Sequence, residues 1–304
     1  MSSPRARRPD RSPKLHGVNP VVAAGVTNVS YACGNTATGV AVKRNSGIKV
    51  ALWTAIAGLV VYLAPMLVFF RGELARLTPV NIALIGSISL LGLTAYACVL
   101  TGMQRGSVTL AGVITGAFPA ITTIVAIALF GERLTIAQGV VIAVVIGGAL
   151  LAASEQRFRD VFRGIRGSSL VFPFAAAVLF GFYFALLRIP VHRVGWFVPQ
   201  YAANIVGVPL FVIYAKRLGE SDVLTRPARP FLITAIATVN IGATMMYSYA
   251  IQKGSTAIVA PIAGSYPALF VIFTWLVFRE RLRFVQYIGI VATVAGITAL
   301  ALLS

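Results

Sequence analysis

The sequence has few charged residues and few of the residues from which metal and disulfide sites are built. Charged residues make up 11% of the 304 residues and hydrophobic residues 58%, whereas roughly a quarter of the residues in soluble domains are charged. Two His and two Cys residues occur, without a CxxC pair. From this composition we expect neither a disulfide framework nor a metal site, and no cofactor. This composition favours a bilayer as the surrounding medium.

Ten segments of the chain are apolar over a length that crosses a hydrocarbon core of about 30 Å. Helices are expected, because a helix satisfies its own backbone hydrogen bonds in lipid and a strand barrel would show alternating polarity. The links between segments are too short for a soluble domain. We predict an all-α integral membrane bundle of ten transmembrane helices, at 20–42, 50–70, 80–103, 107–130, 136–153, 169–190, 195–215, 231–251, 255–278 and 284–303.

The net charge of +18 comes from Lys and Arg residues that lie mostly beside the ends of these segments. There they meet anionic lipid head groups, so membrane lipids are expected as partners and nucleic acid is not. Residues 1–19 are basic and precede an apolar segment, as in a secretory signal. That segment is longer than the roughly 7–15 residues of a signal core. We expect 1–19 to be a disordered tail and the first span to be retained.

An internal repeat is the most informative pattern in the chain. Residues 104–152 and 252–300 align without a gap and share polar and small residues as well as apolar ones. A first five-helix repeat at 20–153, a linker at 154–168 and a second five-helix repeat at 169–304 follow from this match. Because five is odd, the second repeat is inverted relative to the first. Inverted repeats build secondary transporters around one central site.

Matching motifs follow the fourth span of each repeat. Pro119 precedes Phe130-Gly131-Glu132-Arg133-Leu134, and Pro267 precedes Phe278-Arg279-Glu280-Arg281-Leu282. In these motifs the chain resembles the EamA-type transporters of the drug/metabolite transporter superfamily. The resemblance implies ten spans in two halves and transport of small metabolites, with amino acid export as a common activity. The long basic tail and Arg279, in place of a small residue, depart from the family pattern.

The resemblance also implies a multi-pass protein of the cell membrane with both termini in the cytoplasm. The basic tail agrees with this orientation under the positive-inside rule. The total of Lys and Arg residues does not, because more of them lie on the side opposite the tail. We adopt the orientation with both termini inside as the expectation to be tested.

Glu132, Arg133, Glu280 and Arg281 are expected at helix starts after the fourth and ninth spans. A carboxylate at a helix start meets the positive end of the helix dipole, and the adjacent Arg can pair with it. Substrate sites in such folds lie near the membrane midplane. We therefore assign these four residues structural roles at the membrane surface.

Pro119 and Pro267 occupy matching positions inside the fourth and ninth spans. A proline interrupts helical hydrogen bonding and frees the carbonyl four residues earlier, which belongs here to Thr115 and Ala263. A simple kink and a hinge beside the central site are both compatible with this pattern. The recurrence in both repeats favours the hinge.

Polar residues line one face of the first span, since Asn28, Tyr31 and Asn35 recur at helical spacing. Lipid disfavours such a face, which must point either to helix–helix hydrogen bonds or to a hydrated cavity. Amide and phenol groups in a cavity bind polar heads while aromatic faces take apolar tails. Tyrosines can instead belong to the interface belt, but Tyr31 and Tyr96 lie mid-span. The predicted substrate-binding residues are Asn28, Tyr31, Asn35, Tyr96, Tyr183, Asn240, Thr244, Tyr247 and Tyr266.

None of the eight acidic residues falls near the centre of a predicted span. Exporters of cationic drugs usually need a carboxylate there, so we expect a neutral, zwitterionic or anionic solute. The predicted function is that of a secondary transporter that acts as an exporter by alternating access, in which one half rocks against the other. We expect the protein to be a monomer or a homodimer. A non-transporting scaffold or sensor stays an alternative. A membrane-embedded lipid enzyme is less favoured, because no nucleophile with an acid–base pair is evident.

Overall fold

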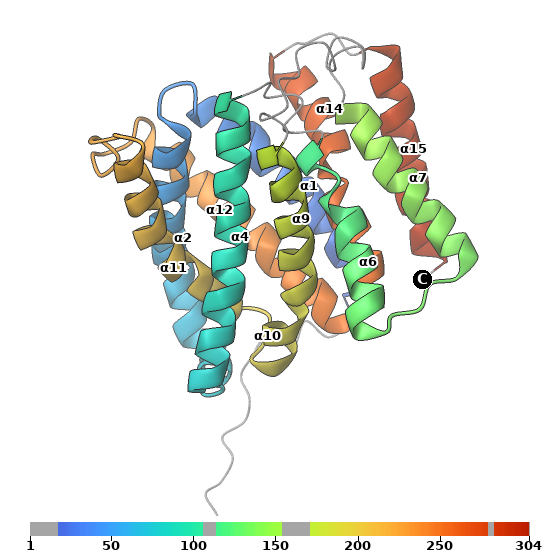
Figure 1. Ribbon diagram of the computed structural model, residues 1–304, viewed down its shortest axis with the longest axis horizontal. Coiled ribbons are helices and arrows are strands. Elements are labelled where there is room, and N and C mark those ends of the chain that lie inside the picture. Colours follow the sequence, from blue (N-terminus) through green and yellow to red (C-terminus); the bar gives the residue numbers. More distant parts are fainter. Residues whose placement is uncertain (1–17, 106–113, 154–170, 279–282, 304) are drawn as a thin grey trace, which may run out of the picture.

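The computed structural model describes residues 18–105, 114–153, 171–278 and 283–303, and every regular element in these ranges is a helix. The helices stand roughly side by side in one bundle (Figure 1). They are α1 Pro20–Ala41, α2 Gly47–Phe69, α3 Arg71–Leu74, α4 Pro79–Arg105, α6 Phe118–Phe130, α7 Ile136–Ala153, α9 Val171–Leu186, α10 Arg188–Arg193, α11 Val198–Arg217, α12 Pro230–Lys253, α13 Thr256–Gly264, α14 Tyr266–Phe278 and α15 Phe284–Leu302.

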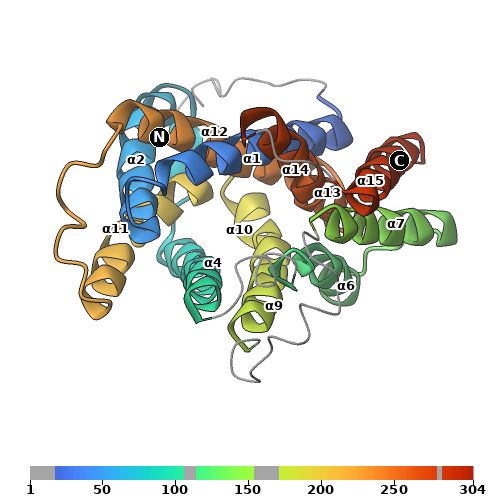
Figure 2. The same cartoon turned by 90° about the horizontal axis from the view of Figure 1, so that it is seen from above.

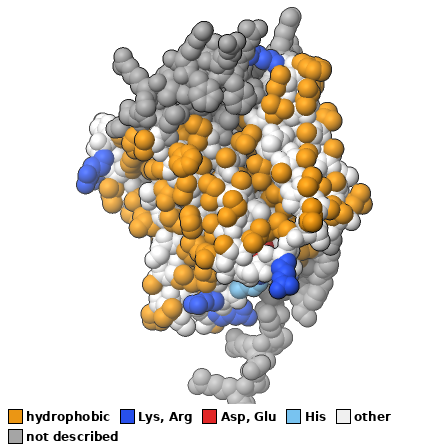
Figure 3. All heavy atoms as spheres, turned by 45° about the vertical axis from the view of Figure 1, so that its right-hand side comes forward, with side chains coloured by type: hydrophobic (Ala, Val, Ile, Leu, Met, Phe, Trp, Pro, Cys, Tyr) orange, Lys and Arg blue, Asp and Glu red, His pale blue; other side chains and the backbone are white. Residues whose placement is uncertain are grey.

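The all-helical membrane fold predicted from the sequence is confirmed, and within the described residues each predicted span contains one helix or a consecutive pair. Residues 107–113 of the fourth span lie outside the described residues. Eight of the spans are long and apolar enough to cross a membrane. The other two are α1, which has 22 residues but an apolar sequence interrupted by polar ones, and α6, which is shorter. Figure 3 shows hydrophobic side chains across the middle of one face, with basic side chains gathered mainly at the lower end.

Short polar residues and prolines set where several helices begin. The Asn19 side chain accepts a hydrogen bond from the Val21 amide at the start of α1, and Ser46 accepts one from the Lys49 amide near the start of α2. Such caps satisfy amides that have no partner within the helix. At the end of α6, Gly131 has a φ of 64°, which a residue with a side chain rarely adopts.

The helices of the two repeats interleave. The most extensive contacts pair α7 with α15, α1 with α12, α4 with α9, α6 with α9, and α2 with α11. Figure 2, seen from above, places α2 and α11 at one end of the bundle and α7 and α15 at the other. Each of these pairs joins one helix from each repeat. The sequence halves are therefore not two separate bodies, and a motion of one whole half against the other stays a prediction.

Close helix packing is clearest between α7 and α15. A β-carbon added to Gly148 would lie 2.9 Å from the Gly289 carbonyl oxygen, and one added to Gly289 would lie 2.4 Å from the Ala152 nitrogen. Only glycine permits backbones to approach this closely, and in a membrane such contacts replace the hydrophobic drive between helices. These two helices therefore form a tightly packed pair.

The ninth span is broken in its middle. Helix α13 ends at Gly264 and α14 starts at Tyr266, with the Ala268 amide bonded to the Ser265 carbonyl at 3.1 Å. At the matching place in the first repeat the Ala120 amide bonds to the Ala117 carbonyl at 3.1 Å, just where α6 begins. Pro119 and Pro267 are thus the second residues of α6 and α14 and do not lie inside a continuous helix. The two repeats share the same interruption.

The two interruptions contact each other within the bundle. A β-carbon added to Gly264 would lie 2.4 Å from Cγ of Pro119, so the end of α13 packs directly against the start of α6. A helix that is interrupted leaves backbone groups available to side chains or to a solute. The crossing of the two breaks is therefore the place to look for a binding site.

Candidate functional site

A buried polar cluster lies where α1 passes the break between α13 and α14. The Asn28 side chain is 2% exposed, and its Nδ2 donates to the Ile262 carbonyl at 2.6 Å and to Ser265 Oγ at 2.8 Å. In an unbroken helix that carbonyl would accept from the amide four residues later. The sequence prediction placed the freed carbonyl at Ala263, one residue further. Asn28 thus ties α1 to the interrupted backbone.

Asn28 also brings an unsatisfied group to this cluster. Its Oδ1 is buried and has no hydrogen-bond partner among the described residues. A buried acceptor without a partner costs free energy that a bound donor would recover. Such an atom is a candidate contact for a solute donor.

Tyr31 lies one turn further along α1 and extends the cluster. Its hydroxyl is 2.9 Å from Thr244 Oγ1 on α12, and its ring lies 5.6 Å from that of Tyr266 on α14, at an interplanar angle of 57°. One phenol therefore joins three helices from both repeats. The structure brings these three predicted residues together.

Tyr183 and Tyr247 both contact Phe184 and extend the group of aromatic rings that begins with Tyr31 and Tyr266. The Phe184 ring lies 4.9 Å from that of Tyr183 and 5.1 Å from that of Tyr247. The Tyr247 hydroxyl donates to the Phe184 carbonyl at 3.2 Å, and Tyr247 is 2% exposed. Tyr247 is therefore held as part of the core, while the Tyr183 hydroxyl donates at 3.5 Å to Oε1 of Gln200 on α11.

The other three predicted residues lie away from this cluster. The Tyr96 ring packs edge-on against Phe211 of α11, at 6.1 Å between centroids. Asn240 packs against Gly34, and its Oδ1 is buried with no hydrogen-bond partner in the described part of the chain. Asn35 follows Gly34 on α1 and is half-buried. These residues lie further along α1, α4 and α12, beyond the crossing of the breaks.

Two polar residues near the centre were not among the sequence predictions. Ser265 sits in the break itself and accepts from Asn28. Gln200 is 3% exposed, and its Nε2 is buried with no partner among the described residues. The signal for Gln200 was present, because a glutamine inside an apolar segment needs a polar partner in the bundle. Helical spacing did not identify Gln200, because it is a single polar residue and does not belong to a polar face.

Glu132 makes a contact between the repeats at the end of the bundle where α13 begins. Its carboxylate accepts from the Thr256 amide at 3.0 Å, the Ala257 amide at 2.7 Å and Ser255 Oγ at 2.6 Å, and it pairs with Arg188. The side chain is 8% exposed. Its own following helix, α7, begins only at Ile136. The helix end that it meets is therefore the start of α13 in the other repeat, not the start of α7.

The other three residues that were assigned structural roles with Glu132 make no described contact of this kind. Arg133 is exposed. Glu280 and Arg281 lie outside the described residues. The described chain holds no group of three His, Cys, Asp or Glu residues that could bind a metal, and its two cysteines, Cys33 and Cys98, are free.

Glu73 of α3 makes a second cross-repeat contact of the same kind. Its carboxylate accepts from the Val198 amide at 2.8 Å and the Phe197 amide at 3.1 Å, at the start of α11. Burial raises the pKa of this carboxyl above its ordinary value, although the backbone hydrogen bonds oppose the shift. Two carboxylates of the first repeat thus close one end of the bundle against helix starts of the second.

The opposite end is also bridged between the repeats. Lys49 at the start of α2 is 7% exposed, and its Nζ lies 2.9 Å from Asp222 Oδ2 and 2.6 Å from Thr225 Oγ1. The hydrogen bond from Lys49 lowers the pKa of the Asp222 carboxyl. The polar cluster therefore lies between two ends that are each held by contacts across the repeats.

Comparison with known proteins agrees with this architecture. The EamA-like transporter family matches residues 20–154 and again 167–302. An uncharacterized protein of Methanocaldococcus jannaschii is 32% identical over 99 residues, which cover 33% of this chain and 72% of that protein. A protein known from a crystal structure has the same fold, with a TM-score of 0.70 over 93% of this chain and 96% of that chain at 17% identity. The two family matches span both repeats, and the chain belongs to the EamA-like transporter family of multi-pass membrane proteins.

Proposed function

We propose that the protein is a secondary transporter that exports a small neutral, zwitterionic or anionic metabolite, such as an amino acid, across the cell membrane by alternating access. The observation that supports this most is the polar cluster at the crossing of the two helix breaks. It contains Asn28, Tyr31 and Thr244, lies between ends that are both bridged, and offers an unpartnered acceptor. Such a cluster resembles the midplane site of repeat-built transporters.

The moving parts in this proposal are groups of helices drawn from both repeats. Helices α6, α7, α13, α14 and α15 form one contacting group, while a second group contains α2, α4, α11 and α12, in which α2 packs with α11 and α12 and α4 packs with α11. Helices α1 and α9 border both groups, since α1 packs on α12 and α14 and α9 packs on α4 and α6. Opening one end requires release of the contacts of Glu132 and Glu73. Opening the other requires release of the contact between Lys49 and Asp222.

The solute class follows from the charges around the cluster. In the described part of the chain, the groups that make these contacts are amides, hydroxyls, backbone carbonyls and phenol rings, and no carboxylate is among them. A cation would lose its hydration without a compensating charge, which is costly. A neutral or zwitterionic solute instead exchanges water hydrogen bonds for those of Asn28 and Tyr31. We place both termini on the cytoplasmic side.

A flux assay tests the proposal. Purified protein is screened for thermal stabilisation by a metabolite panel, and stabilising solutes are then tested for transport into liposomes. Asn28→Ala and Tyr31→Phe each remove one buried hydrogen-bonding group, worth about 1–3 kcal/mol, and should weaken apparent affinity roughly 5- to 100-fold. Thr298→Val on α15, whose hydroxyl bonds only to its own helix at 3.0 Å, is the control.

Two results would contradict the proposal. One is the absence of flux for every stabilising solute, which would favour a scaffold or sensor. The other is specific transport of a quaternary ammonium compound with unchanged affinity in both variants. The second result would place the site elsewhere.

A further inference from the structure

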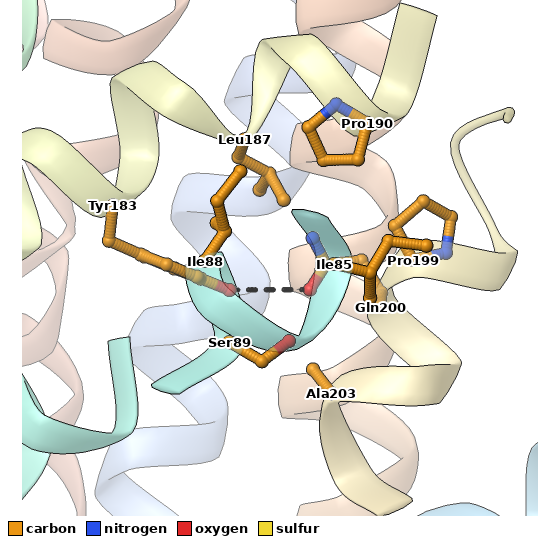
Figure 4. Close-up of a pocket in the computed structure, with 9 residues that line it drawn as sticks. All are labelled: Ile85, Ile88, Ser89, Tyr183, Leu187, Pro190, Pro199, Gln200 and Ala203. Atoms are coloured by element: carbon orange, nitrogen blue, oxygen red, sulfur yellow. Dashed lines mark hydrogen bonds between the residues drawn. The ribbon is translucent and has the colours of Figure 1, made fainter. Parts of the chain in front are cut away.

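A crevice beside the central cluster, which shares Tyr183 with it, lies between α4, α9 with α10, and α11. It is lined by three residues from each of these parts, and Figure 4 shows Tyr183 and Gln200 facing each other across it. In this conformation the crevice is too narrow to hold a water molecule. The lining residues are Ile85, Ile88, Ser89, Tyr183, Leu187, Pro190, Pro199, Gln200 and Ala203.

Gln200 presents an unsatisfied donor in this crevice. The residue is 3% exposed, and its Nε2 is buried and finds no acceptor in the described parts of the chain. Its Oε1 is engaged by the Tyr183 hydroxyl at 3.5 Å, a long hydrogen bond. An amide that is buried with both hydrogens unused costs about 1–3 kcal/mol. An acceptor that enters the crevice would recover this free energy.

The charges around the crevice select the kind of acceptor. None of the nine lining residues is charged. At the start of α11, which contributes Pro199 and Gln200 to the crevice, the amides of Phe197 and Val198 are already taken by the Glu73 carboxylate. An anion would thus lose its water without a counter-charge and would approach a negative group. A neutral oxygen acceptor on an apolar body fits both the free Nε2 and the apolar walls.

We propose that this crevice is a second solute subsite, in which Gln200 Nε2 donates to an uncharged carbonyl oxygen and the apolar lining holds the attached hydrocarbon. The subsite rests on the proposed transport function, because it would receive the uncharged end of the solute beside the central cluster. It is closed in the present conformation and opens when α11 moves relative to α4. Gln200 is then a residue that determines specificity.

Protection of a cysteine in the crevice tests this assignment. Ala203→Cys is made in a Cys33→Ser, Cys98→Ser background, and its reaction with a small water-soluble methanethiosulfonate is followed in the purified protein. The probes are dimethylacetamide, which carries a neutral carbonyl, and isobutyrate, which has a similar shape and a carboxylate. Dimethylacetamide should slow the reaction in a saturable way, and isobutyrate should not.

Two variants separate hydrogen bonding from packing. Gln200→Met keeps the length of the side chain and removes the donor, so protection by dimethylacetamide should weaken roughly fivefold or more. Gln252→Met is the matched control, because the Gln252 amide already donates to the Val191 carbonyl at 3.2 Å and does not line the crevice. If Gln200→Met is not recovered as folded protein, Gln200→Leu also removes the donor and should weaken protection to a similar extent.

Three results would overturn the assignment. They are a cysteine at position 203 that never reacts, equal protection by both probes, and full protection in the Gln200 variants. The assay needs no transported substrate, so protection in a protein that shows no flux would support the subsite while the transport function fails. Flux that depends on Asn28, without protection at position 203, would support the transport function and refute the subsite.

Discussion

Replacing Glu132 by glutamine should destabilise the fold more than it slows transport. The carboxylate holds three donors at the start of α13 and pairs with Arg188. Hydrogen bonds to a charged group contribute about 1.5–3 kcal/mol each, against about 0.5–1.5 kcal/mol for neutral ones. Glutamine keeps one acceptor oxygen, so it retains part of this set as neutral bonds. Its amide hydrogens, however, would face other donors.

The loss is limited by the exposure of Arg188. Removal of one partner from a fully buried ion pair costs about 3–5 kcal/mol. The Arg188 side chain is 27% exposed, so water can replace part of the lost partner. We expect the free energy of unfolding to fall by about 2–3 kcal/mol in Glu132→Gln. Arg133→Gln, a change at the exposed neighbour, should leave it almost unchanged.

The assay compares folded protein with transport per folded molecule. Unfolding is titrated with sodium dodecyl sulfate in mixed micelles, and flux is measured in liposomes with the amount of folded protein normalised. The reasoning is refuted if Glu132→Gln has unaltered stability and loses transport. Glu132 would then take part in the transport cycle itself and not in holding the end of α13.

Further predictions concern pH, packing and orientation. The pKa of the Glu73 carboxyl is raised in the folded protein, so its protonated form stabilises the fold. This contribution to stability is fully present below about pH 4.5 and is lost as the pH rises through the folded-state pKa. Glu73→Gln should therefore flatten the pH dependence of the thermal midpoint above pH 4.5. Gly264→Ala should lower the yield of folded protein, because its β-carbon would meet Pro119, and unaltered thermal stability would contradict this packing. With both termini inside, a single cysteine at Ser168 should react with an impermeant thiol reagent on intact cells, and one at Ser3 should not; the opposite pattern would reverse the orientation.

Most of the fold could be predicted from the periodicity and the length of the apolar segments. Apolar segments long enough for a bilayer gave the helices, and the recurrence of Pro119 as Pro267 placed the interruption of both repeats. Sequence could not show which helices pair, because every membrane helix is apolar and its partners depend on small local contacts such as that between Gly148 and Gly289. The interleaving of the repeats was therefore missed.

The candidate site was predicted in part for a similar reason. A stripe at helical spacing identified Asn28 and Tyr31 on one face of α1, and the structure joins that face to Thr244. Gln200 is a single polar residue without a stripe, and the partner of Glu132 is a helix start more than a hundred residues away. Neither relation leaves a periodic trace in the chain. Their roles in transport stay predictions.

The interleaved pairing also bears on how the chain is assembled during synthesis. Helix α1 is synthesised long before its main partners α12, α13 and α14. Until then the amide of Asn28 lacks the Ile262 carbonyl, and the first five helices hold a polar face without its complement. The polar face of α1 can therefore be covered only after α13 has been synthesised. We expect substitutions in α13 that weaken this contact to leave Asn28 of the first repeat without its partner.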